Sequence, residues 1–157
     1  MSAKPQWGFK LTNAFMDIAL EEARAAADRG EVPVGAVVVH DGQILARSGN
    51  RTLELNDPSG HAEILVIREA CSKLQSQRLP DCDLYVTLEP CTMCAAAISF
   101  ARIRRLYFAA DDPKGGAVQN GVNFFQQPSC HHSPDWYFGL SEQVAAEILR
   151  EFFKSRR

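Results

Sequence analysis

The chain has 157 residues, 46% of them hydrophobic and 23% charged, a composition that is ordinary for a globular protein. We expect one domain over residues 1–157. We expect no membrane span, because no apolar run approaches ~20 residues, and no secretory signal, because the first residues contain no apolar h-region. The formal net charge of −2 gives no sign that the molecule as a whole attracts nucleic acid.

Apolar periodicity and turn residues divide the sequence into helices and strands. In chain order the predicted elements are a helix over residues 12–29, strands over 34–39 and 43–46, a helix over 61–74, a strand over 84–88, a helix over 91–101, a strand over 103–110, a short edge strand over 136–138 and a helix over 141–153. A mixed sheet covered by helices on both faces accommodates this order.

Several element boundaries carry specific signals. Thr12 or Asn13 is suited to cap the first helix, and Ser141 is suited to cap the last one. Gly30 predicts the end of the first helix, because glycine is common just after a helix. The pair Asp41-Gly42 predicts a type I′ turn between the first two strands, which therefore form a hairpin.

Two short motifs carry the chemistry of this sequence. His61-Ala62-Glu63 opens the second predicted helix, and Pro90-Cys91-Thr92-Met93-Cys94 opens the third. A catalytic zinc ion takes three protein ligands and leaves a fourth position open for water. His61, Cys91 and Cys94 supply three ligands, and Glu63 is near enough to act as a general acid and base without binding the metal. The pattern predicts a hydrolytic site with one zinc ion per subunit.

Two other interpretations of these motifs remain open. One is a structural zinc site, which would need a fourth ligand. The remaining histidines, His40, His131 and His132, are distant in sequence from both motifs and lack ligand spacing. The other interpretation is a chance pair of motifs. Thiolate ligands favour zinc over magnesium or manganese.

Cysteine usage and local charge add further expectations. Five cysteines, an odd number with two of them in the CxxC motif, favour a reducing cytoplasm over a disulfide framework. We expect Cys71, Cys82 and Cys130 to be buried as small apolar side chains. Basic residues gather within 102–105 and 154–157, and they are suited either to contact phosphates or to sit at solvated helix ends.

The two motifs and the stretches around them match a known family. The matching stretches are residues 31–37, 49–51, 56–58, 61–64, 84–91, 101–103, 112–116 and 152–153. Together they resemble the bacterial tRNA-specific adenosine deaminases, particularly the alphaproteobacterial ones. The metal motif alone also fits cytosine, guanine and cytidine deaminases.

This resemblance implies a three-layer α/β/α fold of the cytidine-deaminase type with a central mixed five-stranded sheet. It also implies zinc-dependent hydrolytic deamination of adenosine-34, the wobble base in the anticodon of tRNA-Arg, to inosine. Metal-activated water would attack C6, while Glu63 moves protons to N1 and to the departing ammonia. A cytoplasmic homodimer that binds the anticodon arm is implied as well, with no DNA and no membrane among the expected partners.

The resemblance also assigns residues to the adenine base. Asn50 would hydrogen-bond the purine edge, with the main chain of Ala62 nearby. The alternative is that Asn50 only holds a turn before Arg51. The residues that would wall the base, unless they simply pack the core, are Val32, Pro33 and Leu88.

The RNA contacts implied by the resemblance lie in the second half of the chain. Asp112 would accept a hydrogen bond from a ribose 2′-OH, unless it only shapes an Asp–Pro turn. Phe153 would stack on a base or else belong to the core, and His131 and His132 would approach the substrate or remain on the surface. The basic residues expected to meet phosphates are Lys114, Lys154, Arg156 and Arg157.

Two functions of other kinds compete with this one. A deaminase of a free base or nucleoside would use the same metal motif. A zinc-dependent module that binds RNA or assembles with partners, without catalysis, is the second rival. Glu63 argues against such a module, because an unligated carboxylate beside an open metal position has no use there.

Overall fold

The computed structural model describes the backbone of residues 9–156 and the side chains of residues 13–156, so Arg157 lies outside the described residues. The elements are α1 (Phe9–Asp28), β1 (Gly35–His40), β2 (Gln43–Gly49), α2 (Ala62–Leu74), β3 (Cys82–Leu88), α3 (Thr92–Ala101), β4 (Arg105–Ala110), the 3-10 helix η1 (Phe124–Gln126), β5 (Asp135–Phe138) and α4 (Glu142–Lys154). The predicted types and order are confirmed, and only the short helix η1 was not foreseen.

The five strands form one mixed sheet in the order β2-β1-β3-β4-β5. Strand β1 pairs antiparallel with both of its neighbours, whereas β3 with β4 and β4 with β5 are parallel pairs. Strands β2, β3, β4 and β5 therefore run in one direction, and their carboxyl ends meet at the same edge of the sheet. The predicted mixed five-stranded sheet is confirmed.

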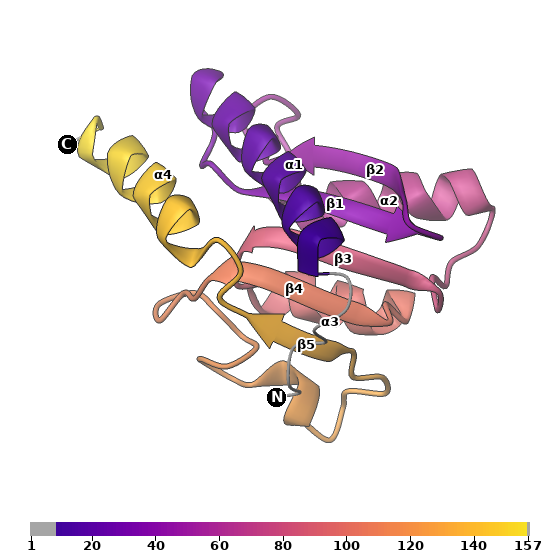
Figure 1. Ribbon diagram of the computed structural model, residues 1–157. Coiled ribbons are helices and arrows are strands. Elements are labelled where there is room, and N and C mark those ends of the chain that lie inside the picture. Colours follow the sequence, from indigo (N-terminus) through magenta and orange to yellow (C-terminus); the bar gives the residue numbers. More distant parts are fainter. Residues whose placement is uncertain (1–8, 157) are drawn as a thin grey trace.

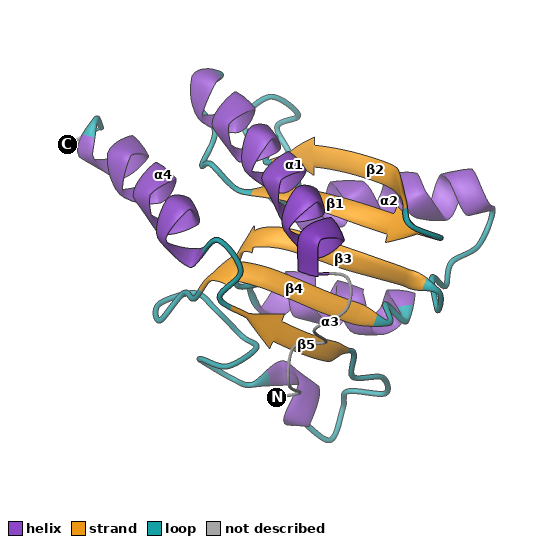
Figure 2. Ribbon diagram, in the orientation of Figure 1, coloured by secondary structure: helices purple, strands orange, loops and turns teal. Residues whose placement is uncertain are grey.

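Helices cover both faces of the sheet, which gives the predicted three layers (Figures 1 and 2). Helices α1 and α4 lie on one face and α2 and α3 on the other. Each face of the sheet has its own hydrophobic core, and alternate strand residues point into one or the other. Leu84 and Phe108 pack toward α2 and α3, whereas Tyr85 and Tyr107 pack toward α1. Within residues 9–156, no helix combines the length and the apolar character needed to cross a membrane.

Two glycines allow α1 to lie directly on the first hairpin. Gly35 and Gly49 face each other in the register of β1 and β2. A Cβ atom at Gly35 would come within 1.9 Å of the Ala19 carbonyl oxygen, and one at Gly49 within 2.6 Å of the Glu22 carbonyl oxygen. Because both side chains are missing, the backbone of α1 can contact the hairpin directly. This contact fixes the end of β2, which residue 50 follows.

The turn residues behave as predicted. Asp41 and Gly42 have φ angles of 51° and 73°, as a type I′ turn requires at both central positions. Gly30 follows α1 with a φ of 85°, which suits glycine far better than any other residue. These positions confirm the predicted hairpin and the predicted end of the first helix.

Both helix-cap predictions were wrong. Thr12 and Asn13 lie inside α1, since the helix already includes Phe9. Ser141 precedes α4 but has a φ of 61° and makes no side-chain cap hydrogen bond. A capping serine needs an extended backbone to aim its oxygen at the first free N–H groups, and the left-handed conformation of Ser141 prevents this.

The three cysteines outside the CxxC motif are free thiols, as expected. Cys82 is buried, as predicted, but Cys71 and Cys130 are only half-buried. The prediction of burial was wrong for these two because each lies at the margin of the core, where it packs against the buried cluster without belonging to it.

Candidate metal centre and active site

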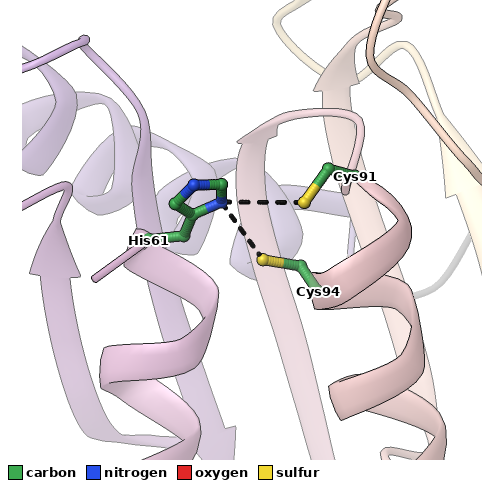
Figure 3. Close-up of side chains that lie close together, drawn as sticks. All are labelled: His61, Cys91 and Cys94. Atoms are coloured by element: carbon green, nitrogen blue, oxygen red, sulfur yellow. Dashed lines mark hydrogen bonds between the residues drawn. The ribbon is translucent and has the colours of Figure 1, made fainter. Parts of the chain in front are cut away.

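The two chemical motifs meet because β2 and β3 end at the same edge of the sheet. Each of these strands is followed by a helix on the same face, so α2 and α3 begin side by side (Figure 3). His61 is the extended residue immediately before α2, and Cys91 is the extended residue immediately before α3. Cys94 lies in the first turn of α3 and points toward the same space.

The three side chains form a compact group. The Nδ1 atom of His61 lies 3.7 Å from Sγ of Cys91 and 3.5 Å from Sγ of Cys94. In a tetrahedral zinc site with Zn–S bonds of about 2.3 Å and Zn–N bonds of about 2.1 Å, nitrogen and sulfur are about 3.6 Å apart. The donor types and their spacing thus fit a zinc ion.

No fourth ligand joins this group among residues 13–156. The candidate ligand atoms of His61, Cys91 and Cys94 lie within 4.8 Å of one another, and they are the only such group of three or more in the described chain. His131 and His132 do not belong to it. Three ligands favour a catalytic site over the structural site that the sequence left open.

Hydrogen bonding within the group shifts the pKa values of the two thiols in opposite directions. A hydrogen bond from Cys94 is the largest cause that lowers the pKa of Cys91 to about 4, with a further contribution from His61 and against the effect of burial. The same bond, together with burial, raises the pKa of Cys94. Its hydrogen bond with Cys91 also raises the pKa of His61. At neutral pH the group therefore already carries one thiolate, which is the form of cysteine that binds metals.

Glu63 lies in the first turn of α2, with only 4% of its surface exposed. Burial is the main cause that raises its pKa to about 7, and the nearby charge of Cys91 adds to this effect. A carboxyl group with a pKa near neutrality can both accept and donate a proton at physiological pH. The surroundings of Glu63 are therefore suited to the acid–base role predicted for it.

Asn50 connects the end of β2 to the start of α2. Its Oδ1 atom accepts a hydrogen bond of 2.8 Å from the Ala62 backbone N–H, and its carbonyl oxygen accepts one of 2.9 Å from Arg29. Its Nδ2 group makes no hydrogen bond among the described residues. Asn50 thus holds the helix that carries Glu63, rather than only a turn before Arg51, and it retains a free donor.

A cleft of about 1170 Å³ opens at the edge of the sheet where the strands end. One wall is the loop after β4, the other is the exposed side of α4, and Val32 and Leu88 complete the lining. Six predicted substrate residues line this cleft, namely Val32, Leu88, Asp112, Lys114, Phe153 and Arg156. Lys154 and the unpredicted Arg150 add positive charge to it. Pro33 and Ala62 are buried and do not line it.

Asp112 shapes the loop wall of this cleft. Its Oδ1 atom accepts hydrogen bonds from the backbone N–H groups of Lys114 at 3.2 Å and Gly115 at 3.0 Å. The interpretation of Asp112 as a turn residue is therefore correct. Its predicted contact with a ribose remains a prediction, which its position in the cleft permits.

Two buried carboxylates that organise the surrounding loops were missed. Glu31 accepts hydrogen bonds from the Thr52 hydroxyl and from the N–H groups of Leu53 and Glu54. Glu89 binds backbone N–H groups of the loop after β4. Glu31 directly precedes an apolar stretch and Glu89 directly follows one, and an acidic residue at such a position was the signal available in the sequence.

The arginine cluster after α3 lies away from the metal group, at the edge of the sheet where β4 and β5 begin. Arg102 donates to the Ser99 carbonyl at the end of α3, and Arg104 forms two hydrogen bonds with Asp83. His132 is bonded to the Ile103 carbonyl at the same edge. Arg102 therefore follows the helix-end interpretation, whereas Arg104 is held by an ion pair that was not foreseen. His132 does not approach the metal group.

Comparison with known proteins identifies the class of the chain as a deaminase, since the MafB19-like deaminase family matches residues 11–157. A tRNA-specific adenosine deaminase of Agrobacterium fabrum is 68% identical over 143 residues, which cover 91% of this chain and 94% of the relative. The chain belongs to the family of bacterial tRNA-specific adenosine deaminases.

Solved structures agree with this assignment. A structure from work on A-to-I editing by tRNA:A34 deaminases at the wobble position superposes with a TM-score of 0.86 and 69% identity, covering 87% of this chain and 99% of that one. A guanine deaminase from Bacillus subtilis is more distant, with a TM-score of 0.62 and 32% identity over 88% of this chain and 92% of that one. The predicted cytidine-deaminase-like fold is confirmed.

Proposed function

We propose that this deaminase converts adenosine at the wobble position of a tRNA anticodon to inosine with release of ammonia, and that its substrate is an arginine tRNA. The observation that carries the proposal is the group of His61, Cys91 and Cys94 beside the buried carboxyl group of Glu63. Two relatives that are 68% and 46% identical over 91% of this chain are named tRNA-specific adenosine deaminases. The three-ligand group supports a hydrolytic reaction, and the relatives support a tRNA substrate. The choice of an arginine tRNA follows the family resemblance of the sequence.

The three ligands would hold one zinc ion, which when bound lowers the pKa of a coordinated water toward neutrality. Glu63, with its pKa raised to about 7, would accept a proton from water and pass it to N1 of the base. It would then accept the second proton from the oxygen added at C6 and pass it to the leaving amine. Asn50 would donate from Nδ2 to the purine edge while its Oδ1 atom stays bonded to Ala62. The buried position of Asn50 keeps this donor in a fixed orientation.

The cleft between the loop after β4 and α4 would receive the anticodon loop. Four cations line it, Lys114, Arg150, Lys154 and Arg156, and they suit a phosphate backbone. Phe153 is 47% exposed, so its ring is available to stack on an unpaired base. We further propose a cytoplasmic homodimer, by analogy with the family that the sequence resembles.

The test is inosine formation on an anticodon stem-loop of an arginine tRNA with adenosine at the wobble position. Wild type and Glu63→Ala are run side by side, the nucleosides are quantified by mass spectrometry, and zinc is measured in both proteins. We expect inosine from wild type only, at equal zinc content. A hairpin with its adenosine paired in the stem is the control RNA and should remain unedited.

Three results would overturn the proposal or one of its parts. Wild type with a full complement of zinc that forms no inosine would exclude the tRNA substrate, and turnover of free guanine or adenosine at a comparable rate would favour a free-base deaminase. Equal inosine formation by Glu63→Ala would remove the catalytic role of Glu63. A stem-loop of another tRNA with the same wobble adenosine tests the choice of arginine tRNA.

A further inference from the structure

Glu89 is a buried carboxylate that the chemistry above does not use. It follows the last residue of β3 and has 2% of its surface exposed. Its Oε1 atom accepts hydrogen bonds from the Asp112 N–H at 2.9 Å and from the side chain of Asn120 at 2.7 Å. Its Oε2 atom accepts three more, each of 3.0 Å, from the N–H groups of Val118, Gln119 and Asn120. One carboxylate thus binds both ends of the segment 112–120.

The loop is closely fitted around this carboxylate. A Cβ atom at Gly116 would lie 2.4 Å from Cδ of Glu89 and 2.5 Å from its Oε2 atom. The loop also closes on itself through a hydrogen bond from Gly116 N–H to the Asp112 carbonyl. A second one, from Ala117 N–H to the Pro90 carbonyl, joins it to the segment between β3 and α3, and both are 2.9 Å long. Removing the charge of Glu89 would leave several backbone N–H groups without an acceptor.

The segment that Glu89 holds is one wall of the cleft. Asp111, Asp112, Lys114 and Gly115 line the cleft on this side, opposite α4. Glu89 itself lies beneath the wall with both oxygens occupied by hydrogen bonds, so it is not available to exchange a proton with a substrate. Any effect of Glu89 on RNA has to pass through the position of the loop.

We propose that Glu89 is a positioning residue for RNA binding, which holds the loop 112–120 in the shape that receives the anticodon loop. This inference rests on the proposed function. Glu89 and Glu63 are both buried glutamates near the same metal ligands, but their roles differ. Loss of Glu89 is expected to weaken substrate binding, whereas loss of Glu63 stops the chemical step.

The first test is Glu89→Gln in the zinc-loaded protein. Whichever way the amide is turned, its NH₂ group faces backbone N–H donors that the carboxylate accepted. We expect the KM for the stem-loop to rise about tenfold, as the loss of one or two hydrogen bonds would give, with kcat within about twofold of wild type. The matched control is Asp83→Asn, the same change in a buried carboxylate near the other end of β3, which should leave KM unchanged.

A second change should restore what the first removes. In Glu89→Gln combined with Asn120→Asp, the new carboxylate accepts from the amide of residue 89, so the side-chain hydrogen bond returns with donor and acceptor exchanged. We expect KM to recover at least partly toward the wild-type value. Gly116→Ala is an independent variant that displaces the carboxylate by steric contact and leaves Glu89 intact, and it should raise KM as well.

Amide hydrogen exchange provides a measurement that does not depend on the substrate. The N–H groups of residues 112 and 118–120 should exchange faster in Glu89→Gln than in wild type, and no faster in Asp83→Asn. Unchanged exchange in Glu89→Gln would refute the inference even if the proposed substrate were wrong. With an active wild type, an unchanged KM in both Glu89→Gln and Gly116→Ala would refute it too, as would a lower kcat accompanied by loss of zinc.

Discussion

At the scale of single residues, three buried glutamates show how surroundings decide chemistry. Glu31, Glu63 and Glu89 are 2%, 4% and 2% exposed, and burial acts to raise the pKa of each. For Glu31 and Glu89, hydrogen bonds from N–H groups outweigh burial, and the pKa falls below its usual value. Glu63 receives too little such support, and its pKa rises to about 7. Two glutamates are fixed anions, and the third can move protons.

Asn50 combines a structural and a binding role that substitution can separate. Asn50→Asp keeps the acceptor for the Ala62 N–H but removes the Nδ2 donor, so we expect unchanged thermal stability and a 10- to 100-fold lower kcat/KM, roughly the effect of a lost buried hydrogen bond. Asn50→Ala loses both groups and should also lose about 1 kcal/mol of stability. Calorimetry and steady-state kinetics on zinc-matched samples measure the two effects. Equal stability of both variants would contradict the helix-holding role.

Glu31 should make part of the stability depend on acid pH. Its pKa in the folded protein is lowered from the ordinary 4.5, so the folded state favours the ionised form. The stabilisation is complete above the ordinary value and is lost as pH falls through the lowered pKa. The stability difference between wild type and Glu31→Gln should therefore shrink as pH falls below the ordinary value of 4.5. Urea unfolding across this range measures it, and a constant difference would contradict the assignment.

At the scale of elements, the metal group depends on one feature of the sheet. Because β1 runs opposite to β2 and β3, those two strands end at the same edge, and the helices that follow them start together. His61 and Cys91 are thus brought into contact although 30 residues separate them. The positive ends of two helices also meet at this point, which stabilises a thiolate.

Helix α1 should tolerate no side chain at Gly35. Gly35→Ala places a methyl group 1.9 Å from the Ala19 carbonyl oxygen, and we expect a loss of about 3 kcal/mol or more, the upper range for overpacking. Gly42→Ala, at the turn of the same hairpin, meets nothing within 4 Å and should lose only about 1 kcal/mol for its positive φ. Denaturant unfolding compares the two, and similar losses would contradict the packing argument.

Local signals in the sequence were sufficient for most of this fold. Alternation and helical periodicity predicted the elements, and the spacing of Cys91 and Cys94 predicted two ligands on one helix turn. Loop shape was less accessible, because it depends on long-range hydrogen bonds. Glu89 forms hydrogen bonds with residues 23 to 31 positions further along the chain, and no periodic pattern in the sequence predicts such contacts. The conformation of Ser141 was missed for a related reason, since its left-handed backbone has no local sequence signal.

At the scale of the whole molecule, metal should contribute to stability as well as to activity. A ligand that binds only the folded state stabilises it by about 2.7 kcal/mol at a free concentration one hundred times its Kd. Treatment with a chelator should therefore lower the melting temperature and abolish inosine formation. Added zinc should restore both properties and magnesium neither, because thiolates prefer the softer ion. An unchanged melting temperature after verified metal removal would contradict the metal-site assignment.

The two walls of the cleft are anchored in very different ways. The loop wall is held by five hydrogen bonds to one buried carboxylate, whereas α4 buries only Ala145 and Phe152 among its own residues. Segments with few buried contacts open at low energetic cost. We expect α4 to tilt so that RNA loops of different width fit the cleft, while the protein loop after β4 keeps its position. Evolution toward new RNA substrates would then proceed mainly through this helix.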